Sequence, residues 1–222
     1  NWAESGKDGQ GRDKRTNAVD DDGDGYVDNW RGWDVVGGVS PTLGEAFKPD
    51  NDPSPEDAGA THGSLTAGCI VASGNNGKGG AGTAFGCRYM PIKAAGKDYN
   101  SDVSGGYEGI HYASTHGARI INCSWGGPVG SSDVTLINQL LLEASDRNAL
   151  VVVAAGNDGK NNDVTPYYPA SGPGVLSVGA TDQFDAPAFF TNYGHTINVF
   201  APGVGIYSTS YPGTNAYVSE DG

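Results

Sequence analysis

Two side chains in this sequence could take part in acyl chemistry, although more than ninety residues separate them. His62 opens a run of small residues that ends at Gly68, and Asn157 follows the apolar run that ends at Gly156. An imidazole held at the start of a helix can accept a proton from a hydroxyl group. A carboxamide held by rigid backbone can stabilise a developing oxyanion. Taken alone, each residue is better explained by a structural role, as a helix-terminal histidine or as part of an Asn-Asp-Gly turn.

The elements that must position these residues follow from the apolar patterns after residue 60. Near-continuous apolar runs mark strands buried in a parallel sheet, and apolar residues at helical spacing mark the buried face of a helix. The patterns predict strands at 88–94, 118–124, 149–154, 175–180 and 197–201, and helices at 65–72, 103–116 and 132–147. This alternation predicts an α/β fold with a mostly parallel sheet, whose site lies beyond the carboxyl ends of the strands.

Residues 1–60 differ from the rest because they are polar and rich in Asp, Gly, Asn and Pro. We expect them to form an acidic, loop-rich surface segment and not a core, while residues 61–222 form the main part of a single domain. Long loops without regular structure are unusual in compact domains, so this segment suggests a functional loop, a loop held by a metal ion, or a missing element upstream.

An aspartate-rich loop in that segment has the spacing of a calcium site. Oxygen donors stand at positions 1, 3, 5 and 9, Gly25 stands at position 6, and the residue at position 7 offers its carbonyl. The predicted ligands are Asp20, Asp22, Asp24, Tyr26 and Asp28. Position 12 is Arg31 instead of Glu, so the loop is not a complete EF-hand. The alternative is a solvated acidic turn, but crowded carboxylates repel one another without a cation.

Composition excludes some classes of partner. The 222 residues carry a net charge of −13, which argues against a nucleic-acid partner because phosphate binding needs clustered Lys and Arg. No apolar stretch approaches the ~20 residues that span a bilayer. Three cysteines leave at least one thiol unpaired within the chain. A bond between Cys69 and Cys87 and three buried free thiols remain alternatives.

The residues around His62 and Asn157 resemble the subtilisin-like serine protease family, the subtilases. The histidine and Gly63 are followed by a short run of small residues that ends in Ala67-Gly68, although Ser64 and Leu65 depart from the usual residues. After the asparagine the resemblance continues in the same order, through Tyr168-Pro169-Ala170, Leu176–Ala180, Phe189–Gly194 and Val199–Gly203. It implies a three-layer α/β fold with helices on both faces of the sheet, incomplete at both ends of this chain.

The resemblance also implies the roles of the site residues. His62 would be the general base of an Asp-His-Ser triad, and Asn157 would hold the oxyanion. Two backbone segments would bind a polypeptide substrate as an added strand and line its first specificity pocket, namely Ser124-Trp125-Gly126 and Ala154-Ala155-Gly156. Trp125 replaces the Leu that is usual in the family. The family's Gly-Thr-Ser-Met-Ala string is absent, and neither Asp8 nor Asp13 follows an apolar strand.

We therefore expect a serine endopeptidase in which only the histidine of the triad lies in these residues. The chain alone would be inactive and would need the remaining segments of the same protein or a larger assembly. The alternative is a non-catalytic relative that binds peptides or serves in an assembly. The acidic composition and the family resemblance favour a secreted or cell-envelope protein, with calcium as its structural metal.

Overall fold

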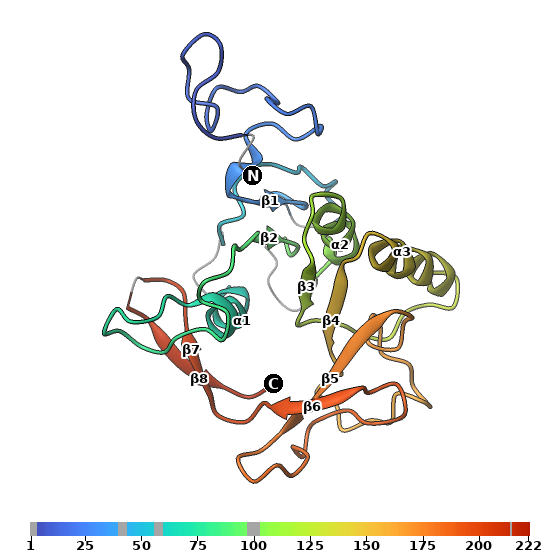
Figure 1. Cartoon of the computed structure of the whole chain (residues 1–222). Helices are drawn as coiled ribbons and strands as arrows, with labels where there is room; N and C mark the ends of the chain where they lie inside the picture. The colour runs from blue at the N-terminus through green and yellow to red at the C-terminus, as the bar shows by residue number, and fades with distance from the viewer. Residues whose placement is uncertain (1–3, 40–43, 56–59, 97–102, 214) are drawn as a thin grey trace. The chain divides into compact units, whose positions relative to one another are not determined.

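The computed structural model describes residues 4–39, 44–55, 60–96, 103–213 and 215–222 (Figure 1). The chain divides into two compact units. The first comprises Asn1–Ala60 and Arg88–Gly109, and the second comprises Thr61–Cys87 and Ile110–Gly222. The division after Ala60 lies where the composition of the chain changes, while Arg88–Gly109 belongs to the first unit.

The second unit is built on a four-stranded sheet in which every pairing is parallel. The strands run in the order of the chain: β3 (Ile120–Cys123), β4 (Leu150–Ala154), β5 (Val175–Thr181) and β6 (Val199–Pro202). Val151 and Val153 of β4 are buried, while Val152 and Ala154 are half-buried, so one face of this strand is more enclosed than the other. The α/β fold with a parallel sheet is as predicted from the sequence.

The described residues also form three α-helices: α1 (His62–Val71), α2 (Gly106–Thr115) and α3 (Val134–Asp146). In α3 the residues at helical spacing, Ile137, Leu141 and Ala144, are buried, and the helix lies beside β4 (Figure 1). Gly117 follows the end of α2 with a φ of +83°, a conformation that favours glycine. The N-cap position of α3 is Asp133, whose side chain makes no capping hydrogen bond.

An antiparallel hairpin of β7 (Ile206–Thr209) and β8 (Tyr217–Glu220) completes the second unit, and the sequence patterns did not predict it. Its strands are short and carry polar residues, so they lack the apolar runs that identified the central strands. The hairpin packs against α1 (Figure 1), which makes it the support of the helix that begins with His62.

The first unit contains a small core where we expected only surface loops. A short helical turn, Asn29–Arg31, precedes β1 (Trp33–Asp34), which pairs in parallel with β2 (Ile92–Lys93). Buried residues of this core are Val35, Val36 and Val39, packed with Trp33, Ile92 and Ala94. The expectation of no core was wrong because the apolar partners come from a distant part of the chain. Among the described helices, none is long and apolar enough to cross a membrane.

Candidate active site

His62 is the first residue of α1 and its side chain is exposed. Two hydroxyl groups of β7 fasten the first turn of this helix. Ser208 Oγ donates to the carbonyl of Leu65 and Thr209 Oγ1 donates to the carbonyl of Ser64, each at 2.7 Å. A Cβ atom at Gly68 would lie only 2.1 Å from Thr209 Oγ1, so glycine is required for this close approach. The imidazole therefore stands on a firmly held backbone and faces solvent.

Asn157 lies exposed in the loop that follows β4, where the sequence placed it. A second asparagine, Asn192, fixes the backbone of this loop. Its Oδ1 atom accepts hydrogen bonds from the backbone N–H groups of Asp158 and Lys160, both at 3.0 Å, and its own N–H donates to the carbonyl of Gly156 at 2.8 Å. The Nδ2 atom of Asn192 in turn donates to Asn162 Oδ1 at 3.0 Å. Asn157 is thus flanked on both sides by anchored backbone.

Asn162 and Asn192 are each only 1% exposed, and the sequence reading missed both. Asn162 closes the network by donating from Nδ2 to the carbonyl of Ala155 at 2.9 Å. Asn192 was recognised only as part of the Phe189–Gly194 resemblance, because no local pattern reveals a side chain that bonds backbone more than thirty residues away.

Replacing Asn192 by alanine should lower the free energy of unfolding by about 2–3 kcal/mol, because it leaves buried hydrogen-bonding groups without partners. Asn76→Ala is the matched control, since Asn76 is exposed and accepts one local bond from the N–H of Lys78. Urea unfolding of the purified protein measures both variants. Equal effects of the two substitutions would show that Asn192 does not anchor the loop.

The two predicted substrate-binding segments follow neighbouring strands. In the pairing of β3 with β4, Cys123 lies opposite Val153. The next residues, Ser124 and Ala154, therefore stand side by side at the carboxyl ends of these strands. The glycine in each segment is required by a close contact. A Cβ atom at Gly126 would lie 2.5 Å from the Tyr167 ring, and one at Gly156, which has a φ of +109°, would lie 2.3 Å from Asn192 Nδ2. Trp125 lies between Ser124 and Gly126, is half-buried and forms part of the same edge.

The residues that follow β8, Asp221 and Gly222, bring the chain close to the Asn157 carboxamide. The N–H of Gly222 donates to the carbonyl of Gly203 at 2.8 Å, and Asp221 Oδ1 accepts from the N–H of Gly205 at 2.7 Å. A Cβ atom at Gly222 would lie 3.4 Å from Asn157 Nδ2. The same hairpin that supports the His62 helix therefore brings its own end to Asn157.

Comparison with known proteins identifies the family. The model of the subtilase family matches residues 40–222. The chain belongs to the subtilase family. The predicted resemblance and the three-layer α/β fold are both confirmed by this match and by a solved structure, a protease from Pseudoalteromonas arctica. That structure superposes on this subtilase with a TM-score of 0.70 at 28% identity, and the match covers 86% of this chain and 66% of the other.

Curated relatives agree with this assignment. Thermitase of Thermoactinomyces vulgaris is 36% identical over 191 residues, which are 86% of this subtilase and 61% of thermitase. The extracellular basic protease of Dichelobacter nodosus is 36% identical over 206 residues, covering 89% of this chain and 31% of that protein. The chain thus spans less than two thirds of the length of each of these two relatives.

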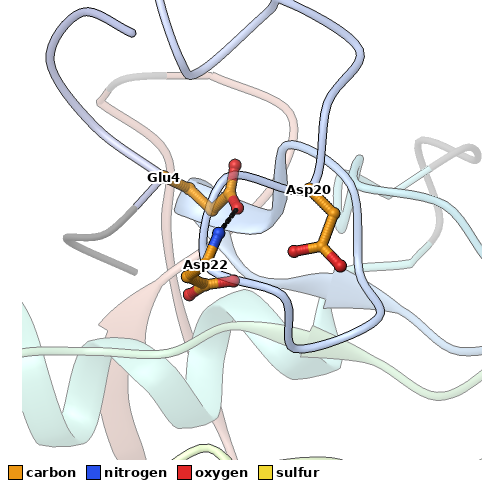
Figure 2. A group of neighbouring side chains, drawn as sticks. All are labelled: Glu4, Asp20 and Asp22. Atoms are coloured by element: carbon orange, nitrogen blue, oxygen red, sulfur yellow. Dashed lines mark hydrogen bonds between the residues drawn. The ribbon is translucent and has the colours of Figure 1, made fainter. Parts of the chain in front are cut away.

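In the aspartate loop of this subtilase, two of the predicted calcium ligands, Asp20 and Asp22, lie beside a third carboxylate, that of Glu4. Within the described residues, oxygen atoms of Glu4, Asp20 and Asp22 lie within 4.8 Å of one another (Figure 2). Asp24 and Asp28 lie outside this group. The carboxylate of Asp24 accepts from the N–H of Tyr26 and from Asn29 Nδ2, and that of Asp28 accepts from the N–H of Ala18. Glu4 was not predicted, because it stands outside the loop motif.

The two aspartates considered as triad partners are engaged by arginines. Asp8 accepts from Arg12 Nε at 2.7 Å, and Asp13 accepts from Arg15 Nε at 2.8 Å. Desolvation raises the pKa of Asp8, but the hydrogen bonds from Arg12 and Asn17 outweigh it and bring the pKa to about 2. The side-chain bond from Arg15 lowers the pKa of Asp13 to about 2 as well. Both carboxylates thus stabilise local turns of the first unit through hydrogen bonds to nearby arginines.

The three cysteines of this subtilase are free thiols in the structure. Cys69 is half-buried, Cys87 is exposed and Cys123 is buried. Burial raises the pKa of Cys123 to about 12, so this thiol stays protonated and unreactive at neutral pH. It acts as a small apolar side chain of β3.

Proposed function

We propose that the whole protein is a secreted or cell-envelope serine endopeptidase that hydrolyses peptide bonds. His62 is the general base, and Asn157 stabilises the oxyanion. The nucleophilic serine and the orienting aspartate of the triad lie outside residues 1–222. The subtilase family and the protease relatives support serine endopeptidase activity. Relatives named extracellular proteases, including that of Xanthomonas campestris pv. campestris, support an extracytoplasmic location.

One observation supports this proposal above the others: the helix that begins with His62 packs against a hairpin, and the residue that ends the described chain after that hairpin lies beside Asn157. Ser208 and Thr209 of β7 hold the helix that begins with His62. The partner strand β8 leads to Gly222, beside Asn157 Nδ2. The hairpin of β7 and β8 thus lies next to the helix of the base at one place and leads to the oxyanion donor at another. Acyl transfer requires two such groups, far apart in the sequence, to be held near each other.

The proposed reaction follows from these positions. The substrate lies as an added strand along the edges formed by Ser124–Gly126 and Ala154–Gly156. The serine oxygen attacks the scissile carbonyl carbon while His62 takes its proton, and the carbonyl oxygen becomes an oxyanion that accepts from Asn157 Nδ2. His62 then gives the proton to the leaving amine as the carbon–nitrogen bond breaks. Water hydrolyses the acyl-enzyme by the same steps in reverse order.

Labelling of the whole protein with a fluorophosphonate probe tests the proposal. We expect a stable covalent adduct on one serine, and peptide mapping should place that serine outside residues 1–222. Labelling of a serine inside this range would contradict the assignment of the nucleophile. Absence of labelling together with binding of peptides would favour the alternative, a non-catalytic relative that retains the peptide groove.

A further inference from the structure

The glycines of the two substrate-binding segments share one neighbour, the ring of Tyr167. A Cβ atom at Gly126 would lie 2.5 Å from Tyr167 Cε1, and one at Gly156 would lie 3.1 Å from Tyr167 Cζ. Tyr167 is half-buried and belongs to neither segment in the sequence. Its ring therefore lies against the backbone of both segments, at the positions where neither of them carries a side chain.

The backbone of Tyr167 is held by hydrogen bonds in its own turn and at the next residue. The N–H of Tyr167 donates to Ser171 Oγ at 3.0 Å, and its carbonyl accepts from the N–H of Ser171 at 2.8 Å. Tyr168 exchanges two backbone hydrogen bonds with Gly127, at 2.8 and 2.9 Å. These bonds tie the loop of Tyr167 directly to the segment that contains Gly126.

The hydroxyl end of the Tyr167 ring lies toward the loop of Asn157. Cζ, the ring atom that bears the hydroxyl group, is the atom that a Cβ at Gly156 would approach, whereas Cε1 is the closest one at Gly126. Burial raises the pKa of Tyr167, and the negative charge of Asp158 raises it further, so the phenol stays neutral. A neutral aromatic ring therefore occupies the space between the two segments.

A substrate of the proposed reaction has to share this space. In an added strand the side chains alternate between the two faces, so one side chain enters between the segments where the scissile carbonyl lies beside Asn157. Close packing leaves little free volume around a held ring. A side chain as large as that of phenylalanine would have to displace Tyr167, whereas a hydrogen atom, a methyl group or a hydroxymethyl group would not.

We propose that Tyr167 fills the first specificity pocket and makes this subtilase selective for a small residue, Gly, Ala or Ser, before the scissile bond. The inference rests on the peptide hydrolysis proposed above and specifies its substrate class. Gly126 and Gly156 contribute by leaving room for the ring, and the ring limits the size of the substrate side chain.

Two chromogenic peptides that differ only in the residue before the scissile bond, Ala or Phe, test the proposal with the whole protein. The parent should hydrolyse the Ala peptide with a kcat/KM at least about tenfold higher, since small differences in pocket fit have effects of that size. Tyr167→Ala should shift the ratio of the two values at least about tenfold toward the Phe peptide, because it opens the space. Tyr167→Phe keeps the ring and should retain the ratio of the parent. Tyr89→Ala, an exposed change in the first unit, is the control and should leave both values unchanged.

A binding measurement separates this inference from the proposed function. Fluorescence anisotropy of labelled peptides that end in Ala or Phe requires no nucleophile, and the parent should bind the Ala peptide more tightly. If no peptide is hydrolysed, the proposed function fails while the two Kd values still test Tyr167. A parent that prefers the Phe peptide, a parent that binds neither peptide, or a Tyr167→Ala variant with the ratio of the parent would each overturn the proposal. If Tyr167→Ala does not fold, the preference of the parent decides.

Discussion

Replacing His62 by alanine in the whole protein should lower kcat/KM for peptide hydrolysis by about 10⁴-fold, the upper range for loss of a general base. The reason is that no other group is proposed to take the proton of the serine hydroxyl. His62 is exposed and α1 is held by backbone carbonyls that accept from Ser208 and Thr209. The substitution should therefore leave the melting temperature close to that of the parent.

His111→Ala is the matched control, because His111 is also exposed on a helix and has no assigned role in catalysis. Steady-state hydrolysis of a chromogenic peptide should give the parent value for this variant. If His62→Ala retained more than about one tenth of the parent kcat/KM, another group would be the base and the assignment of His62 would be wrong.

Replacing Lys93 by methionine should destabilise the protein by about 3–5 kcal/mol, because it leaves a buried aspartate without its counter-charge. The Nζ atom of Lys93 lies 2.7 Å from Asp34 Oδ2, and the two side chains are only 11% and 2% exposed. Asp34 Oδ1 accepts from the N–H groups of Val36 and Gly37, at 2.9 and 2.8 Å. The pair thus joins β1 to β2 beside the core of the first unit.

The exposed pair of Arg147 and Glu143 on α3 provides the contrast, with 38% and 41% exposure and a separation of 3.7 Å. Arg147→Met should change stability by less than about 1 kcal/mol. Adding Asp34→Asn to Lys93→Met should recover part of the loss, since the unpaired charge is then removed as well. Urea unfolding followed by tryptophan fluorescence measures all three variants. A loss in Lys93→Met no larger than in Arg147→Met would show that the buried pair is not a main support of this unit.

The sequence predicted those parts of the fold that carry a strong local pattern. The apolar face of α3 and the central strands β3 to β6 were identified because their apolar residues repeat at fixed spacing. The hairpin of β7 and β8 was missed, although Ile206–Thr209 and Tyr217–Glu220 are rich in β-branched and aromatic residues and flank the turn residues Pro212-Gly213. Turn residues between short strand-forming runs are the signal that could have revealed it.

The remaining differences come from contacts between distant parts of the chain. The core around Val36 was missed because its partners Ile92 and Ala94 follow more than fifty residues later. Glu4 and Asn192 were missed because each acts through bonds from its side chain to distant backbone N–H groups, which leave no periodic pattern. In contrast, His62 and Asn157 stand at the ends of regular elements, where local sequence does indicate position. Their roles in catalysis remain predictions.

A crystal structure of the whole protein with a peptide aldehyde tests the central claim most directly. We predict a covalent hemiacetal on a serine outside residues 1–222, with its oxygen about 2.7–3.1 Å from Asn157 Nδ2 and the His62 imidazole within hydrogen-bonding reach of the serine oxygen. An adduct whose oxygen lies away from Asn157, or a serine beyond the reach of His62, would contradict the account.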